Sequence, residues 1–310
     1  MSARTKLIIA FAAVYTIWGS TYLAIRLSVE TIPPFLMAGA RFLLAGALMT
    51  GLARARGAQM PTWRQWRSTL IVGFLLLVGG NGALTWAEQE VPSGLASLLV
   101  ATVPLWMVLL DWARPAGLRP NSRVFAGLAL GMVGLAVLVG PELSAGLAPG
   151  SGPGPTATGI AAILFGSFSW AAGSIYSRGA EMPKAPLLGV GLEMLNAGVL
   201  LLLISLLSGD AASLVPADVS TRSFLAYLYL VFIGALVGYT AYIYLLGHTT
   251  AAKVSTYAYV NPVVAVFLGW LLIGEEVTLR TLAGAAIIVI AVALISLTRA
   301  PRRRPLSPAG

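Results

Sequence analysis

The sequence predicts an all-α membrane protein in which ten transmembrane helices form two inverted five-helix repeats, with both termini in the cytoplasm. Three observations lead to this fold class. Of the 310 residues, 58% are hydrophobic and 10% are charged, and the apolar residues fall in runs of about twenty, the length that crosses a bilayer. Two stretches of the chain repeat each other at a fixed offset, and basic residues gather in every second connection between the runs.

The apolar runs between polar breaks predict the spans in chain order. Their ranges are 7–25, 33–53, 68–87, 92–112, 122–141, 157–177, 185–207, 223–246, 252–273 and 279–298. The first run follows Arg4 and Lys6, as the apolar part of a signal peptide does. Its partner in the repeat lies in mid-chain around Trp170, where no leader can be cleaved away. We therefore expect the first run to be a true span.

The repeat is carried by residues that recur in the same order. At an offset of 152 residues the second copy matches Trp18, Arg26, Pro34, Gly39, Ala45 and Gly46 with Trp170, Arg178, Pro186, Gly191, Ala197 and Gly198. The offset rises to 158 at Pro104 and Pro262, which predicts a six-residue insertion in the 208–222 loop. Five spans per copy is an odd number, so the second copy must enter the membrane from the opposite side. We expect repeat 1 over 7–141, a periplasmic linker over 142–156, repeat 2 over 157–298 and a basic cytoplasmic tail over 299–310.

Charge predicts the orientation of the spans. If the N-terminus is cytoplasmic, sixteen of the 20 Lys and Arg residues lie in inside segments, Arg26, Arg222 and Arg280 lie outside, and Arg41 lies within a span. The positive-inside rule reads this bias as a chain with both termini in the cytoplasm. The net charge of +9 is dispersed among short connections, a distribution that argues against nucleic acid as a partner. The tail Arg302–Arg304 is expected to hold the C-terminus inside, with anionic lipid binding as the alternative.

Several short motifs resemble a known family. They are Ile17-Trp18-Gly19-Ser20-Thr21-Tyr22, Arg41-Phe42, Val103-Pro104, Ser169-Trp170-Ala171, Tyr259-Val260-Asn261-Pro262-Val263 and Gly274-Glu275-Glu276. Together they resemble the bacterial EamA-type branch of the drug/metabolite transporter superfamily, over nearly the whole chain. The run from Gly80-Asn81-Gly82 through Ala87-Glu88 and Val91-Pro92-Ser93-Gly94 to Ala101-Thr102-Val103-Pro104 is similar to the YedA-type inner-membrane exporters within it.

The resemblance implies ten helices in two EamA repeats with both termini inside, in agreement with the separate argument from charge. It also implies export, a direction that the residues alone do not indicate. The chain departs from an even duplication in two places. Ala171-Ala172 replaces Gly19-Ser20, and the Gly274-Glu275-Glu276 signature has no counterpart in the first copy. We therefore expect the two ends of the pathway to differ in chemistry.

Two ionisable residues fall deep within predicted spans. Arg41 lies in the second span and Glu193 in the seventh, at equivalent positions of the repeat with opposite charge. A charge at the bilayer centre costs about 2.5–3.5 kcal/mol on insertion scales, so such residues usually serve a pathway. We expect both to face a shared central cavity, where they either pair with each other or receive the carboxylate and ammonium of a zwitterionic substrate. The alternative is an internal ion pair or backbone contacts that only lock helices together.

Proline and polar residues mark a similar depth. Pro104 and Pro262 each lie about a dozen residues into a span, where proline frees a carbonyl and bends a helix. They are expected to be hinges or to border the site, with tolerated packing kinks as the alternative. Tyr257 and Asn261 are four residues apart and share a helix face, and Asn81 lies among glycines. These polar groups are expected to bind substrate or to pair between helices.

Aromatic residues supply further candidates for the pathway. Trp18 and Trp170 are equivalent in the repeat and are flanked by small residues, which favours a place in the lining over the interfacial belt where Trp is also enriched. Glu193 is a candidate proton carrier. Glu88 is a candidate guard of the outer mouth.

No catalytic constellation is present in the sequence. There is no cysteine and His248 is the single histidine, which argues against a metal centre, and no cofactor is expected. No glycine-rich loop is followed by a lysine, as a phosphate-binding motif requires. The sequence therefore predicts a secondary transporter and no enzyme, driven by an ion gradient such as protons, by exchange or by facilitated flow.

We expect a multi-pass protein of the bacterial inner membrane that exports small amphipathic metabolites, such as amino acids, their analogues or drugs, by alternating access. The substrate pathway is expected to contain Trp18, Arg41, Asn81, Trp170, Glu193, Tyr257 and Asn261. An importer or exchanger of the same solutes is the first alternative, and a membrane protein that binds or assembles partners without transport is the second. The sequence does not define the oligomeric state.

Overall fold

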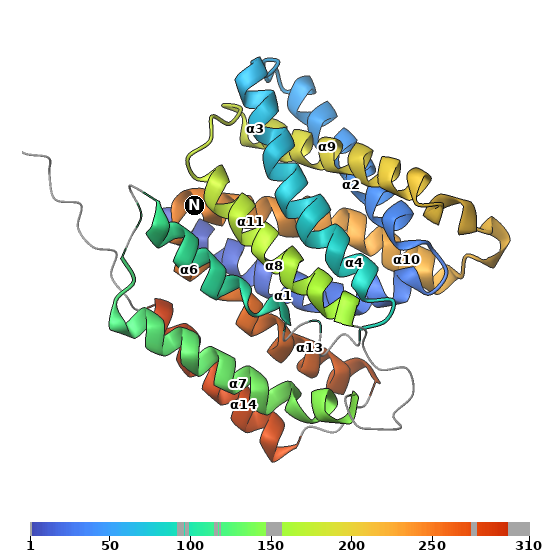
Figure 1. Cartoon of the computed structure of the whole chain (residues 1–310). Helices are drawn as coiled ribbons and strands as arrows, with labels where there is room; N and C mark the ends of the chain where they lie inside the picture. Colours follow the sequence, from blue (N-terminus) through green and yellow to red (C-terminus); the bar gives the residue numbers. More distant parts are fainter. Residues whose placement is uncertain are drawn as a thin grey trace, which may run out of the picture.

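In the computed structural model the residues described are 2–91, 96, 99–114, 117, 119–146, 157–273 and 278–296, and this part of the chain is built of helices and short connections. Helices α2 (Pro34–Ala55), α3 (Trp63–Gly73) and α9 (Pro186–Leu207) lie together at one side of the molecule (Figure 1). Helices α7 (Ser122–Gly146) and α14 (Leu279–Ser296) lie side by side at the other. The remaining helices, including α1 (Ala3–Val29) and α8 (Ala157–Ser177), pass between these two groups.

Six helices of the described part are long and apolar enough to cross a membrane. They cover Ala3–Val29, Pro34–Ala55, Trp63–Ala87, Thr158–Ser177, Pro186–Leu207 and Thr221–His248. Shorter apolar helices cover Val103–Ala113, Ser122–Gly134 and Leu282–Ile295. The predicted all-α membrane class is therefore what the structure has.

Two of the six long helices are not α-helical throughout. The first joins α3, the π-helix η1 (Phe74–Gly82) and α4 (Ala83–Ala87). The second joins α10 (Thr221–Tyr229), the π-helix η4 (Leu230–Tyr239) and α11 (Thr240–His248). The two π-helices occupy equivalent positions at the offset of 158 residues. Wide π-turns are rare and often mark functional sites, and hydropathy does not reveal them.

The helix starts explain why several spans are longer than their apolar runs. Ser2 caps α1 by accepting from the Thr5 N–H (3.1 Å), and Thr62 and Gln65 form a reciprocal capping box at the start of α3. Pro34 and Pro186, equivalent in the repeat, lie in the first turns of α2 and α9, where their missing N–H costs no hydrogen bond.

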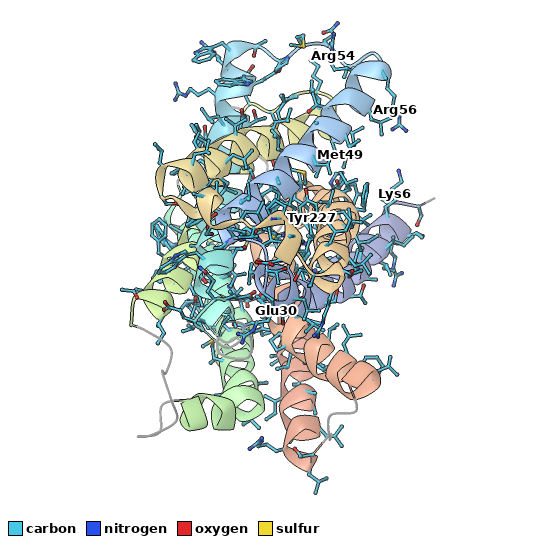
Figure 2. The ribbon with its side chains drawn as sticks, turned by 90° about the vertical axis from the view of Figure 1, so that its right-hand side faces the viewer. Lys6, Glu30, Met49, Arg54, Arg56 and Tyr227 are labelled. Carbon is cyan, nitrogen blue, oxygen red and sulfur yellow. The ribbon has the colours of Figure 1, made fainter. Side chains whose placement is uncertain are left out.

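Arg54 and Arg56 stand clear of the bundle at the end of α2 (Figure 2).

The connection between α9 and α10 fastens the start of α2. It contains two short 3₁₀ helices, η2 (Asp210–Ser213) and η3 (Pro216–Asp218). Asp210 Oδ2 accepts from the backbone N–H of Leu36 (2.9 Å) and from the Ser205 hydroxyl (2.7 Å). A carboxylate at a helix start satisfies a free N–H group and complements the helix dipole. This side chain therefore links the end of α9 to the beginning of α2.

Both proline-containing spans are interrupted, but in different ways. Pro104 lies in the first turn of α6 (Val103–Ala113), directly after the turn at Ala101 and Thr102, rather than inside a continuous helix as expected. Proline fits a first turn because no N–H is needed there. Pro262 does lie inside α13 (Tyr257–Ile273), and a turn separates that helix from the short α12 (Ala251–Val254).

Small residues set the spacing of α2 and α9. A methyl group at Gly46 would lie 2.5 Å from the backbone nitrogen of Leu195, and one at Gly198 would lie 2.5 Å from that of Leu43. A methyl group could not fit at such distances, which are far below van der Waals contact. The two helix backbones therefore pack directly against each other, as small residues permit in membrane helices. Gly46 and Gly198 are partners in the repeat, and their contacts are equivalent.

Some sequence predictions fall outside the described residues. These are the Pro92-Ser93-Gly94 segment, the Gly274-Glu275-Glu276 signature, residues 147–156 of the linker and the tail over 299–310.

Candidate functional site

An aromatic cluster lies at the centre of the molecule and consists of Trp18, Trp170, Tyr242 and Tyr257. The ring of Trp18 is 5.4 Å from that of Trp170, 4.9 Å from Tyr242 and 5.0 Å from Tyr257, measured between centroids. The Trp170 indole donates to the Tyr242 hydroxyl (2.9 Å), which also bonds to Ser174 (2.6 Å). Edge-to-face rings at these distances stabilise one another beyond their buried area. The two tryptophans predicted to line a pathway are therefore brought together.

The helices that carry the tryptophans approach the π-helices closely. A Cβ atom at Gly238 of η4 would lie 2.6 Å from the Trp18 indole nitrogen, and one at Gly80 of η1 would lie 2.8 Å from the Trp170 ring. Trp18 also donates to the carbonyl of Gly234 (3.4 Å). Glycine at both positions leaves room for an indole ring over each π-helix. The duplication thus builds two equivalent Trp–Gly contacts around the same centre.

A central cavity borders this cluster, with about 70 Å³ of open volume. Six of the seven residues predicted for the substrate pathway line it: Trp18, Arg41, Asn81, Trp170, Tyr257 and Asn261. Tyr22 and Tyr239 join them, and most of the remaining wall is apolar. A largely apolar cavity with a few convergent polar groups is the usual form of a small-molecule site.

Arg41 places a positive charge at the wall of the central cavity. The residue is 4% exposed, and its Nε and Nη1 groups have no hydrogen-bond partner. Its guanidinium carbon lies 4.8 Å from the centre of the Phe42 ring, a cation–π distance. Tyr227 of α10, labelled in Figure 2, is half-buried and interacts electrostatically with Arg41. Two unsatisfied N–H groups on a buried cation favour an anionic ligand, because an unpaired buried charge is costly.

The predicted polar residues enter the cavity from opposite sides. Asn81, at the end of η1, accepts from the Thr85 hydroxyl through Oδ1 (3.4 Å). Asn261 of α13 is 1% exposed, and its Oδ1 has no hydrogen-bond partner. A buried carbonyl oxygen without a donor is available to an N–H or O–H group of a ligand. The cavity therefore combines cationic donors on Arg41 with a free acceptor on Asn261.

Glu193 does not share this cavity, contrary to the expectation that it would face Arg41. It lines a second cavity of about 320 Å³, together with Arg114, Arg178 and Ile243. Arg41 and Glu193 do not form an ion pair with each other, and Arg114 pairs with Asp111 (3.2 Å). Helices α2 and α9 pack face to face, and equivalent positions on them point to different sides of their contact. The depth of each charge in its span can be predicted from the sequence, but the side of the helix to which it points cannot.

Tyr239 connects the two cavities. Tyr239 is one of the residues that line the central cavity, and its hydroxyl donates to Oε2 of Glu193 (2.6 Å), whose other oxygen has no hydrogen-bond partner. Both side chains are buried, at 2% and 0% exposure. Tyr239 is the repeat partner of Asn81 at the offset of 158. Tyr239 is not among the residues predicted for the site from the sequence, and its equivalence to Asn81 is the signal by which it could have been found.

The second cavity opens where α6, α8 and α11 end and α9 begins. Arg178 donates to the carbonyls of Leu246 and Thr249, both at 2.8 Å. Burial lowers the pKa of Arg178, while nearby Asp111 opposes this change. The two arginines are thus held by carbonyl and carboxylate partners.

Glu88 is buried at the other end of the bundle, directly after α4. It is 0% exposed, neither carboxyl oxygen has a hydrogen-bond partner, and it lines neither cavity. Burial raises the pKa of this carboxyl well above its usual range, and nearby Arg26 partly opposes the rise. Arg26 itself donates to the backbone carbonyl of Glu88 (3.4 Å). Glu88 was expected to guard an outer mouth, and the structure places it inside the packed wall.

Among the described residues, no group of three or more His, Asp or Glu side chains is arranged to hold a metal ion.

Comparison with known proteins places this geometry among transporters. The model of the EamA-like transporter family matches residues 5–140 and 157–297. The chain is 40% identical over 290 residues to the uncharacterized inner membrane transporter YedA of Escherichia coli K12, covering 93% of this chain and 90% of that protein. It is 29% identical over 287 residues to a probable amino-acid metabolite efflux pump of Salmonella typhimurium LT2, covering 89% and 90%. A crystal structure of a protein 22% identical in sequence matches with a TM-score of 0.75 over 97% of this chain and 100% of that one, which shows the fold alone.

Proposed function

Because the chain belongs to the EamA-like transporter family, we propose that it exports small amphipathic metabolites across the bacterial inner membrane. The observation that carries the proposal is Arg41, a buried cation with two unpartnered N–H groups in the wall of an aromatic cavity. Family membership supports transport, and the Salmonella relative, named as a probable amino-acid efflux pump, supports amino acids and their analogues as the first substrates to test.

The substrate we propose carries a carboxylate and an apolar group. The carboxylate would accept from Arg41, because a guanidinium binds carboxylates through paired N–H groups. The apolar group would lie against the rings of Trp18 and Trp170, and the free Oδ1 of Asn261 would accept from an amine. In this arrangement Arg41 binds the carboxylate of the substrate. Asn261 binds the amine, a role that was predicted from the sequence for Glu193.

We further propose ten spans in two inverted repeats, with both termini in the cytoplasm and alternating access between the halves. Support comes from the equivalent contacts of Gly46 and Gly198 and of the two tryptophans, which relate the halves residue by residue. In this topology the second cavity faces the cytoplasm and the aromatic cluster separates it from the central cavity. Export would then need the cluster to part on one side and close on the other.

Counterflow in proteoliposomes tests the proposed substrate site. Vesicles are preloaded with amino acids and amphipathic drugs, and exchange is compared between wild type, Arg41→Ala, Arg41→Lys and the exposed control Arg222→Ala. Truncating one partner of a buried charge pair costs about 2–5 kcal/mol, so Arg41→Ala should lose roughly thirtyfold or more in transport. Arg41→Lys should recover part of it, and Arg222→Ala should match wild type.

Folding of each variant is checked first by size-exclusion chromatography. A folded Arg41→Ala protein that exchanges solutes as wild type does would remove Arg41 from the site. Absence of exchange by wild type, together with stabilisation by a protein partner, would favour the alternative of a non-transporting membrane protein.

Cysteine labelling tests the proposed topology without background, because the chain has no cysteine. Gln59→Cys lies in the exposed connection between α2 and α3, and Ala212→Cys lies in the exposed connection after α9. A membrane-impermeant maleimide added to whole cells should label Ala212→Cys alone. Labelling of Gln59→Cys instead would reverse the proposed orientation.

A further inference from the structure

The two cavities are joined at one hydrogen bond, between Tyr239 and Glu193. The tyrosine faces the central cavity and the carboxyl faces the second cavity, with 2.6 Å between the hydroxyl and Oε2. Both side chains are buried. This hydrogen bond therefore links a residue of one cavity wall directly to a residue of the other.

The carboxyl of Glu193 is incompletely satisfied. Its Oε1 has no hydrogen-bond partner, and no basic side chain in the described part of the chain pairs with it. A buried carboxylate in this state is costly, whereas a carboxylic acid is neutral and can donate from its own O–H. The geometry thus favours a site that alternates between a bound and a released proton.

The charged neighbours of Glu193 are oriented toward other partners. Arg114 and Arg178 line the same cavity, but the first pairs with Asp111 and the second donates to backbone carbonyls. Each keeps one Nε group without a partner, and neither bonds to Glu193. Arg41 faces the central cavity. The titratable group in contact with Glu193 is the hydroxyl of Tyr239 on η4, which bonds to it, whereas the hydroxyl of Tyr242 bonds to Ser174. None of these groups supplies Glu193 with a fixed counter-ion.

We propose that Glu193 binds the proton whose movement drives export, with Tyr239 as the relay from the central cavity. The proposal rests on the proposed function, because coupling has meaning only in a transporter. In the relay, a hydronium ion in the central cavity gives a proton to the Tyr239 oxygen while the Tyr239 hydroxyl gives its own to Oε2, and a water molecule is left in that cavity. The tyrosine stays neutral and Glu193 becomes a carboxylic acid. When the second cavity is open to the cytoplasm, the acid releases that proton to water there.

A proton fits this site better than a metal cation. Hard cations such as Ca²⁺ take several oxygen ligands at once, and Glu193 offers one free carboxyl oxygen with a hydroxyl at the other. The repeat partners of this pair are Arg41 and Asn81, which cannot carry a proton in the same way. The proton path is therefore built in one half of the molecule alone.

Two measurements on the reconstituted full chain test the inference. The first follows the infrared band of protonated carboxyl groups between pH 5 and 9 without solute, in wild type, Glu193→Gln and the control Glu88→Gln. The second records the internal pH of vesicles with trapped pyranine, after natural amino acids are added outside. Glu88 is the matched control because it is equally buried but lines neither cavity.

We expect Glu193→Gln to lose one titrating carboxyl band and the solute-driven pH change together. Tyr239→Phe should keep the band but slow the pH change by about tenfold or more, since it removes only the relay hydroxyl. If Glu193→Gln fails to fold, the Tyr239→Phe variant alone still tests the relay. Glu88→Gln should retain the solute-driven pH change.

The inference is overturned if Glu193→Gln keeps the wild-type pH change, or if Glu88→Gln loses it instead. Solute counterflow without any pH change in the wild type would also overturn it, while leaving the proposed transporter standing. Absence of counterflow in the wild type would overturn the proposed function and the coupling with it.

Discussion

The two halves of this molecule agree where backbone meets backbone and differ where side chains enter the cavities. Gly46 and Gly198 make equivalent contacts across α2 and α9. Arg26 donates to the carbonyl of Glu88, and its repeat partner Arg178 donates to the carbonyl of Leu246, which is the partner of Glu88. These contacts use backbone atoms, so they survive changes of the neighbouring side chains.

Polar side chains at and near the cavities have diverged, whereas Trp18 and Trp170 are the same residue in both halves. Arg41 corresponds to Glu193, Asn81 to Tyr239 and Glu88 to Leu246. An exact duplicate would present the same chemistry to both sides of the membrane. In the transport cycle we propose, the duplication supplies the frame for alternating access, and the divergence at a few positions supplies the substrate site and the direction.

The largest expected effect comes from exchanging the two charges. Arg41→Glu with Glu193→Arg should be as inactive as either single variant, because the two residues line different cavities and do not pair. Each exchanged side chain becomes a buried charge without a partner, which costs about 3–5 kcal/mol. Counterflow by the folded double variant measures this. Recovery of wild-type exchange would mean that the charges meet during transport.

The next effect tests the shared backbone frame. Gly46→Ala and Gly198→Ala should each destabilise the protein by about 1–3 kcal/mol, because the new methyl group would collide with backbone on the facing helix. Gly51→Ala on the same helix is the control, since nothing lies within 4 Å of its Cβ position. Thermal unfolding in detergent should show two equal losses and none for Gly51→Ala. If only one of the two glycine variants lowered the unfolding temperature, the contacts of Gly46 and Gly198 would not be equivalent.

The sequence predicted the spans well because hydropathy measures what the bilayer selects. The predicted ranges 33–53 and 185–207 match α2 and α9 within about two residues. It underestimated α1, which runs over Ala3–Val29 against 7–25, because polar residues at helix ends are capped or reach the interface without breaking the helix. It missed the π-helices, since a wide turn changes hydrogen bonding but not apolarity.

The site was predicted in part for a similar reason. Repeat offset and depth in the spans predicted that Trp18, Trp170 and Arg41 share one cavity, and the structure places all three in its wall. Depth does not define rotation about the helix axis, so Glu193 was assigned to the wrong cavity. The hydrogen bond of Tyr239 depends on the exact orientation of two helices, which a single sequence does not supply.

The smallest effect concerns the diverged pair Glu88 and Leu246. Because burial raises the pKa of Glu88 above its ordinary value of 4.5, the folded state holds this proton more tightly than the unfolded state. Stability then falls as the pH rises from that ordinary value through the raised one, by up to about 1.4 kcal/mol per pH unit within the window. Glu88→Gln should therefore unfold at a higher temperature than wild type at alkaline pH and at nearly the same temperature near pH 4.

Thermal unfolding of wild type, Glu88→Gln and the exposed control Glu90→Gln from pH 4 to 9 measures this dependence. If the advantage of Glu88→Gln stays constant with pH, Glu88 does not change its protonation on folding, and the difference from Leu246 is one of packing. If the difference in unfolding temperature between Glu88→Gln and wild type grows with pH, Glu88 is a buried acid that is protonated in the folded state. Low pH would then stabilise the end of the molecule that holds Glu88, and not the equivalent end that holds Leu246. The halves would then differ in their response to pH as well as in their cavities, although Arg26 and Arg178 hold both ends by the same backbone contact.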